Sequence, residues 1–286
     1  MSNQENRDMK IRKILVPLDA SPHSMAALQA AVNCARNLEA ELQGLFVEDT
    51  DLLKLGDFPF AQEVCVYSRE CRPLDKQNLE RQLRARAAHV RQKLAELSGR
   101  YHVPWTFRVS RGGVSSEILS ATSDADMTIL GKLGWSPAKS SRMGSTVEQI
   151  IKKGRCPTFI LQEGVRLQDP VIVLFTGSKL SWNCLSIAAK MGKMTLNPLV
   201  VLIPAATDEK YQKLSEQAQA YLQTLNIQDS RFQHLEKPYV QVLYQKIHGA
   251  GPILLPDEKI DNLETSLKEI LSRFKNPVLL VKEREL

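Results

Sequence analysis

The sequence of 286 residues lacks any apolar run that approaches the roughly 20 residues needed to cross a membrane as a helix. Its N-terminal segment, Met1–Asp8, is polar and has no apolar core of the kind found in secretory signals. The five cysteines are odd in number and scattered, with no CxxC pair and no Cys/His spacing typical of zinc. These absences argue against a membrane span and a zinc site, and they predict a cytoplasmic protein with reduced thiols.

Two common nucleotide signatures are also absent. The sequence contains neither a Walker A pattern (GxxxxGK[ST]) nor a GxGxxG pattern, which disfavours P-loop ATPases and dinucleotide-dependent enzymes. The net charge of +6 is spread out, with 23 basic and 19 acidic residues in 1–163 and 15 and 13 in 164–286. A nucleic-acid-binding surface needs clustered positive charge. Nucleic acid is therefore not an expected partner, whereas a mildly basic surface favours the approach of a small anion.

The N-terminal part of the chain predicts strands that alternate with helices. Lys13–Asp19 is an apolar run that ends in an acid, as expected for a buried parallel strand. Ser21-Pro22 then supplies an N-cap and a first-turn proline for a helix. Further strands are expected at Leu42–Val47, Met127–Leu130 and Thr158–Leu161. Residues 108–111 are expected to end a short third strand. This alternation is typical of a doubly wound α/β fold.

The same plan starts again after residue 169, so we interpret the chain as a tandem duplication of two domains, 1–165 and 168–286. The segment Val16–Ser21 aligns with Val173–Ser178, and Thr176 takes the place of the acid at position 19. The fourth strand of the second half is followed by acidic residues, among them Glu258, instead of a glycine loop. These side chains would repel a phosphate chain, so only the first half is expected to carry an anion site.

The most informative pattern follows the predicted strand Met127–Leu130. It consists of Gly131 and Gly134, then nine residues, then Gly144-Ser145-Thr146 before a helical pattern. Glycine lets the backbone approach a ligand closely, and the first amides of a helix have no partner within the helix. The serine and threonine hydroxyls can also donate to phosphate oxygens. The pattern therefore predicts a phosphate-binding loop, although Ser145-Thr146 taken alone would be an ordinary helix start.

In an open parallel sheet, ligands bind at the carboxyl ends of the strands where the strand order reverses. If the first and fourth strands flank that point, Asp19 and Gly131 lie side by side. Asp19 would then accept from a ribose hydroxyl or an adenine amino group, and Val16, Val47 and Leu130 would form an apolar slot for the base. An acid at the end of a strand is by itself more often a turn or cap residue. The prediction therefore rests on the combination of Asp19 with the glycine pattern at the end of the fourth strand.

An insertion separates the second strand from the third, from about Glu48 to Asp75. It contains apolar segments at 52–55 and 58–60 and leads into a helix whose apolar face carries residues such as Leu79 and Leu83. The other face is rich in arginine, for which a solvated helix surface is the plainer interpretation and a surface for RNA or another anionic partner the alternative. The insertion is the expected contact region if the chain has a protein partner.

The chain resembles the universal stress protein family in its tandem-domain form. The resemblance rests on Lys13–Ser21, on the run Gly131/Gly134/Gly144-Ser145-Thr146 and on the strand ending Cys156–Leu161. It covers residues 12–163 well, and it extends over 170–282 by topology and by the segment 276–281. The glycine spacing matches the family's ATP-binding branch.

The resemblance implies an α/β architecture of two tandem, doubly wound, parallel five-stranded sheets with strand order 3-2-1-4-5. It places an adenine nucleotide, ATP or AMP, in the crevice between the first and fourth strands. The family also pairs its last strands, so Thr158–Leu161 and Val278–Val281 are expected to pair antiparallel about an internal pseudo-twofold axis, which would protect two edge strands. Together with the slot and the loop, the residues expected to contact the nucleotide are Pro17, Leu18, Asp19, Val47, Leu130, Gly131, Leu133, Gly134, Gly144, Ser145 and Thr146.

Three functions remain open from the sequence. The favoured one is a cytoplasmic, regulatory stress-response protein that binds an adenine nucleotide. The alternatives are a nucleotide-independent adaptor that works through the insertion, and a slow ATPase. Many family members have Ser or Thr where Val147 stands, which makes metal-assisted hydrolysis less expected than binding and leaves Mg²⁺ open. No catalytic residue is expected, and association of two chains into a homodimer is not determined.

Overall fold

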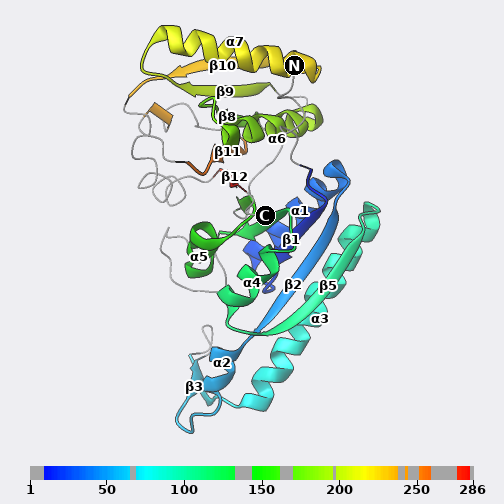
Figure 1. Cartoon of the computed structure of the whole chain (residues 1–286). Helices are drawn as coiled ribbons and strands as arrows, with labels where there is room; N and C mark the ends of the chain where they lie inside the picture. The colour runs from blue at the N-terminus through cyan, green and yellow to red at the C-terminus, as the bar shows by residue number, and fades with distance from the viewer. Residues whose placement is uncertain are drawn as a thin grey trace.

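The computed structural model describes residues 10–64, 69–132, 144–161, 170–195, 198–237, 242–243, 251–258 and 276–283. The expected domain boundary between residues 165 and 168 lies outside this set, as do Leu133 and Gly134. A ten-stranded sheet runs through the chain and a separate two-stranded sheet lies beside it. Figure 1 shows the two halves end to end along the large sheet.

The first half contains seven strands and five helices within the described residues. In chain order these are β1 (Lys13–Pro17), α1 (Pro22–Leu38), β2 (Glu41–Asp49), α2 (Thr50–Leu55), β3 (Gln62–Val64), β4 (Cys71–Pro73), α3 (Lys76–Arg100), β5 (Trp105–Gly112), α4 (Val114–Thr122), β6 (Met127–Gly131), α5 (Ser145–Lys153) and β7 (Thr158–Leu161). Strands β2 and β5 are longer than the sequence predicted, because the two pair with each other over eight residues.

The second half repeats the alternation of strands and helices. Its elements are β8 (Ile172–Leu174), α6 (Lys179–Thr195), β9 (Leu199–Pro204), α7 (Asp208–Thr224), β10 (Ser230–Leu235), β11 (Ile253–Pro256) and β12 (Val278–Val281). No helix in the described part of the chain is both long enough and apolar enough to cross a membrane.

The strand order of the large sheet is β10-β9-β8-β11-β12-β7-β6-β1-β2-β5. Each half therefore has the order 3-2-1-4-5, and all pairs within a half are parallel. The halves meet through β7 and β12, which pair antiparallel with Phe159 opposite Leu279. The expected pairing of the two last strands is thus confirmed, and it buries both strands completely instead of leaving them as edges.

The turn after the first strand is built in the same way in both halves. Leu18 N–H donates to Leu45 O at 2.8 Å, and Phe175 N–H donates to Leu202 O at the same distance. The residue two places further on has positive φ in each half, Ala20 at 63° and Gly177 at 85°. These matching contacts agree with the alignment of Val16–Ser21 with Val173–Ser178.

Alternating side chains of the parallel strands bury two faces of the sheet. One large cluster packs α1, α3, α6 and α7 against one face and includes Ile14 and Val16 of β1. On the other face of the first half, Leu15 packs with Ile118 of α4 and Ile150 of α5. Helix α5 is thereby held against the sheet at the end of β6, where the candidate site lies.

Candidate functional site

The loop after β1 places Asp19 where β1 ends and α1 begins. Its Oδ1 atom accepts a hydrogen bond from Ser21 N–H at 2.9 Å, and its own N–H donates to Ser24 Oγ at 3.4 Å. Ser21 is the N-cap of α1, as predicted, because its hydroxyl accepts from Ser24 N–H. These bonds fix the carboxylate at the carboxyl end of the sheet, where it is half-buried and close to the start of a helix.

Strand β6 lies next to β1 and ends at the same edge of the sheet. The pairs Ile14–Met127 and Leu15–Thr128 set a parallel register, so β1 and the end of β6 run side by side as expected. Gly131, the last residue of β6, lies against the start of α1, and a Cβ atom there would be 2.8 Å from the carbonyl of His23. Gly131 is therefore required for close packing of α1 on β6, a role that the sequence pattern did not reveal.

The side chains expected to form one apolar slot lie on two different faces. Val47 and Leu130 pack with Leu15 in the cluster beneath α4 and α5. Val16 belongs to the cluster on the opposite face, because successive side chains of a strand alternate. The expectation that Val16 shares a slot with Val47 and Leu130 is therefore wrong.

Two further residues of this loop were expected to contact a base. Pro17 ends β1 and is half-buried. Leu18 is 3% exposed, its side chain would be 3.6 Å from a Cβ at Gly44, and its N–H is bonded to Leu45 O. A contact from Leu18 to a ligand would therefore come from its carbonyl group and not from its side chain.

Helix α5 begins at Ser145, in the region where the sequence indicated a helix start, but its N-cap is Gly144 and not Ser145 or Thr146. Gly144 N–H donates to Lys132 O at 3.2 Å, and Gly144 O accepts from Glu148 N–H at 3.0 Å. The Gly144 amide is thus engaged by the protein. No side chain caps this helix, and within the described residues the amides of its first turn, from Ser145 to Val147, have no acceptor. Such amides, together with the helix dipole, favour an anion.

Lys132 follows Gly131 directly and links β6 to the start of α5. Its N–H donates to Leu161 O at 2.6 Å, and its carbonyl holds Gly144. The side chain is 6% exposed, and this burial lowers the pKa of its ammonium group. Sequence reasoning did not find this contact of Lys132 with Gly144, because the two residues are twelve positions apart in the sequence.

A cation at the same end of the sheet, on the edge strand β5, pairs with two acids. Arg111, near the end of β5, donates from Nε to Glu48 Oε2 at 2.8 Å and pairs with Glu80 at 3.3 Å. The hydrogen bond and charge of Glu48 raise the pKa of the Arg111 guanidinium. This pairing spans β2, β5 and α3, and it makes Arg111 a structural cation instead of a free phosphate ligand.

At the corresponding place in the second half, polar side chains are bonded to one another. The Thr176 hydroxyl donates to Glu258 Oε1 at 2.6 Å and lies 3.0 Å from Ser178 Oγ. Thr176 stands where the first half has Asp19, and Glu258 follows β11, the counterpart of β6. A carboxylate therefore occupies the end of the strand at which the first half has its glycine loop, which agrees with the expectation from the sequence.

The far end of α5 is held by the second half of the chain. Lys282, just after β12, donates from Nζ to the carbonyl oxygens of Ile151 and Gly154, the latter at 3.2 Å. It also pairs with Asp257 at 3.6 Å, and its side chain is 8% exposed. Burial lowers the pKa of Lys282, partly offset by Asp257. Sequence analysis missed this contact because its partners are more than 120 residues apart.

A family model described as the universal stress protein family matches residues 10–162, more than half of the chain. The chain belongs to this family. The match covers every described element that forms the candidate site, from the loop after β1 to the start of α5. The resemblance seen in the sequence is thereby confirmed at the level of the family.

Relatives and solved structures agree with this assignment. A universal stress protein of Methanocaldococcus jannaschii is 22% identical over 160 residues, which cover 55% of this chain and 86% of that protein. The crystal structure of a universal stress protein from Archaeoglobus fulgidus has a TM-score of 0.72 at 17% identity, covering 94% of this chain and 98% of its own. A functionally unknown protein from Pseudomonas aeruginosa has a TM-score of 0.64 at 13% identity, with 96% and 94% covered. At these identities the structures show that this universal stress protein shares their α/β fold.

Proposed function

We propose that this universal stress protein binds an adenine nucleotide, ATP or AMP, at the carboxyl ends of β1 and β6, and that it acts as a regulatory protein in the cytoplasm. The observation that carries the proposal is the start of α5, where three successive amides lack an acceptor within the described residues beside the half-buried Asp19 loop. Family membership supports the same assignment. Four free cysteines in the described part of the chain agree with a reducing compartment.

Each part of the nucleotide has a proposed contact. The phosphates would accept from the amides of Ser145, Thr146 and Val147 and from the two hydroxyls, with the positive end of the helix dipole behind them. Asp19 would accept from a ribose hydroxyl, while the half-buried Val47 would face the base and the buried Leu130 would contribute only through its backbone. A Mg²⁺ ion, if present, would be carried mainly by the phosphates, since this cation prefers phosphate and water oxygens over a full protein cage.

We expect adenine nucleotide to stabilise the folded chain. A ligand that binds only the folded state at about 100 times its Kd adds about 2.7 kcal/mol. For a domain of 150–250 residues, each kcal/mol raises the melting temperature by roughly 2–4 °C, so a rise of about 5–10 °C is expected. Thermal melts of the full chain with ATP, AMP and, as a control, inorganic phosphate measure this. An unchanged melting temperature at millimolar nucleotide would contradict the proposal.

We also expect one nucleotide per chain and not two. In the first half, the first amides of α5 have no acceptor among the residues that the structure describes, whereas Glu258 is bonded to Thr176 at the matching place in the second half. Isothermal titration or equilibrium dialysis of the full chain gives the stoichiometry. Two equivalent sites would show that the second half also takes a nucleotide despite the Thr176–Glu258 bond, and the assignment of function to one half would then be wrong.

A second candidate function is an adaptor that works through the insertion without nucleotide. It is favoured by one specific observation, the exposure of Phe58 and Phe60 in that segment at 61% and 91%. The thermal melts separate the two candidates, since an adaptor needs no response to nucleotide. A single-turnover assay with ATP and Mg²⁺ tests the remaining alternative, slow hydrolysis.

A further inference from the structure

The exposed apolar side chains of the molecule are concentrated in one projecting segment, residues 50–75, which we call the arm. Within the described residues only five large apolar side chains are exposed, and four of them lie in the arm: Leu55 at 48%, Phe58 at 61%, Phe60 at 91% and Val64 at 60%. Single exposed apolar residues are common, but a cluster of this kind marks a contact surface.

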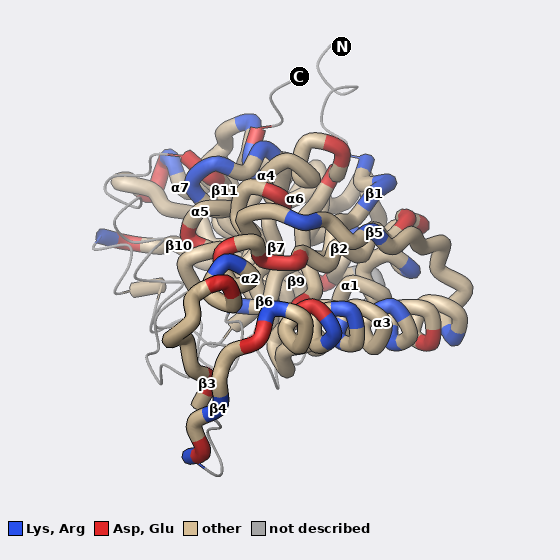
Figure 2. Tube along the Cα trace, turned by 90° about the horizontal axis from the view of Figure 1, so that it is seen from below, with Lys and Arg blue, Asp and Glu red and all other residues tan. Residues whose placement is uncertain are grey.

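The arm is firmly attached at its base but uncovered along its length. Lys76 Nζ pairs with Asp57 at 2.8 Å, Leu74 N–H donates to Ala61 O at 2.8 Å, and Leu53 is buried. Its strands β3 and β4 have three residues each and pair only with each other. Figure 2 shows this hairpin projecting from the body, and no other labelled element of the described chain lies over it. An isolated two-stranded hairpin is marginally stable in water, which favours a partner surface.

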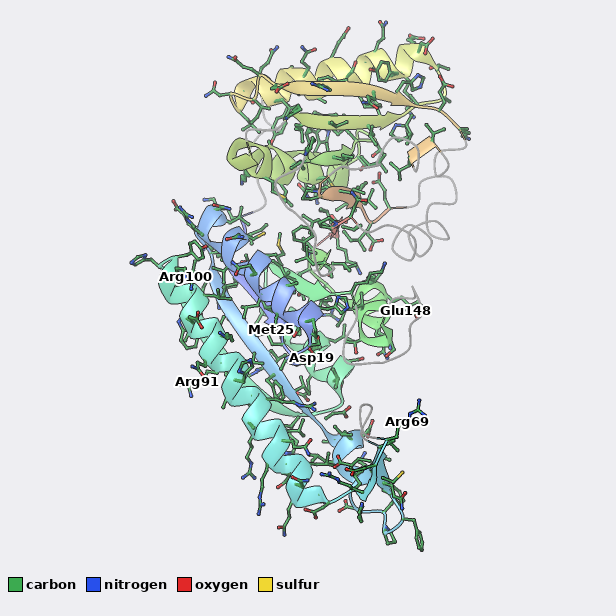
Figure 3. All side chains as sticks on the ribbon, turned by 180° about the vertical axis from the view of Figure 1, so that it is seen from behind. Asp19, Met25, Arg69, Arg91, Arg100 and Glu148 are labelled. Atoms are coloured by element: carbon green, nitrogen blue, oxygen red, sulfur yellow. The ribbon has the colours of Figure 1, made fainter. Side chains whose placement is uncertain are left out.

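The neighbouring helix α3 offers a complementary surface. The arm has five acidic and three basic residues, of which Asp51, Asp57 and Glu70 pair with bases of the same chain, whereas α3 has seven basic and two acidic residues. Arg81, Ala85, Ala88 and Arg91 are exposed and follow one another at spacings of three and four, so they lie on one face of the helix. Figure 3 shows Arg91 pointing away from the sheet. Two small residues between arginines form a shallow apolar strip, on which aromatic rings would pack with guanidinium groups over them.

We propose that the arm is a dimerisation element: Phe58 and Phe60 of one chain dock on the face of α3 around Ala85 and Ala88 of a second copy, and the reverse contact forms at the same time. Every chain carries both surfaces, so one twofold axis satisfies both arms, as in isologous dimers. Ala85 lies about 13 Å along the helix from Lys76, at about 1.5 Å per residue. In the proposed dimer, the twofold axis crosses α3 between its start and Ala85, so that the arm at the start of one α3 meets the region of Ala85 on the other.

The arrangement of the large sheet supports this choice of partner surface. The strands β7 and β12, which end the two halves, are paired with each other within one chain and cannot pair with a second copy. The arm and α3 lie at the far end of the first half, so a dimer formed there leaves the β7–β12 junction untouched (Figure 1). It also leaves the start of α5 outside the contact residues that we name, so the proposal does not depend on nucleotide binding.

Sedimentation equilibrium or light scattering of the full chain tests the proposal. We expect a dimer for the natural sequence, monomers for Phe58→Ser/Phe60→Ser, and monomers for Arg81→Glu/Arg91→Glu. A higher salt concentration should weaken the dimer several-fold, because the Debye length falls from about 14 Å at 50 mM to about 4 Å at 500 mM. Val109→Ser, a change at another exposed apolar residue (46%) on β5, should leave the dimer intact.

A mixing experiment separates this interface from any other. The arm variant keeps a natural α3 surface, and the helix variant keeps a natural arm, so an equimolar mixture should form a heterodimer with one intact contact. Recovery of dimer in the mixture, with neither variant dimeric alone, supports the reciprocal contact. The proposal would be overturned if the natural chain were still monomeric at about 100 μM, since its Kd would then be far weaker than that of a specific dimer. A dimer that survives both double substitutions would also overturn it. Circular dichroism of each variant checks that the fold is retained.

Discussion

A Gly144→Val variant is expected to lose the nucleotide-dependent rise in melting temperature while its melting temperature without ligand changes little. Gly144 has φ −63° and ψ 146°, which any residue adopts. Among the described residues a Cβ there would meet only Lys132 O, at 3.5 Å, an ordinary contact. In the complex, the valine methyl groups would occupy space beside the first amides of α5. The expected loss is the whole ligand stabilisation, about 2.7 kcal/mol at a 100-fold excess over Kd.

The matched control is Gly99→Val at the end of α3. No described atom lies within 4 Å of a Cβ at Gly99, so this substitution is equally open but far along the chain from the site. Its response to nucleotide should equal that of the natural chain in the same thermal melts. A full response of Gly144→Val would mean that the phosphates do not lie at the start of α5. Gly131 is unsuitable for this test, because a side chain there would collide with the His23 backbone.

A Lys282→Met variant is expected to lower the free energy of unfolding by about 2–3 kcal/mol, the usual effect of removing a charged donor from buried acceptors. The ammonium group donates to two carbonyl oxygens in the last turn of α5 and faces Asp257. Methionine fills a similar volume but cannot donate, so the carbonyl groups of Ile151 and Gly154 lose their partner. Urea denaturation measures the change, which is the net value after the cost of burying the charge.

Lys179→Met provides the control for this experiment. Lys179 pairs with Glu283 at 2.7 Å, but both side chains are more than 60% exposed, so its loss should change stability by less than about 1 kcal/mol. Equal effects of the two substitutions would show that Lys282 acts as an ordinary surface charge. That result would remove the evidence that the second half stabilises α5.

The contact of Lys282 gives the second half a structural role in the proposed site. Helix α5 has only nine residues, with the amides that lack an acceptor in the described part of the chain at one end and the Lys282 contacts at the other. A helix of that length is marginal alone and depends on its tertiary contacts. The second half would therefore help to position the proposed phosphate-binding amides of the first, although its own matching position carries Glu258 bonded to Thr176.

Local signals in the sequence predicted the parts of this molecule that depend on neighbouring residues. The cap at Ser21, the start of α5 at Ser145 and the parallel strands were visible because capping residues, glycine and buried apolar runs act over a few positions. The strand order and the pairing of β7 with β12 came from the family resemblance, and the structure agrees with both.

The remaining features depend on contacts between distant segments. Val16 lies on the opposite face of the sheet from Val47 and Leu130. The expected slot of these three residues considers only that they lie near strand ends and ignores the alternation of side chains along a strand. The packing of Gly131 on His23 links residues more than 100 positions apart, and the Lys282 contact spans a still longer separation. No spacing rule connects such residues. Leu133 and Gly134 lie outside the described residues, so their nucleotide contacts stay predictions.

The most direct test of the account is a crystal structure of the full chain grown with a non-hydrolysable ATP analogue. We expect one nucleotide per chain, with phosphate oxygens within hydrogen-bond distance of the amides of Ser145, Thr146 and Val147 and a ribose hydroxyl at Asp19. A nucleotide bound in the second half beside Thr176, or crystals without nucleotide at saturating concentration, would contradict it.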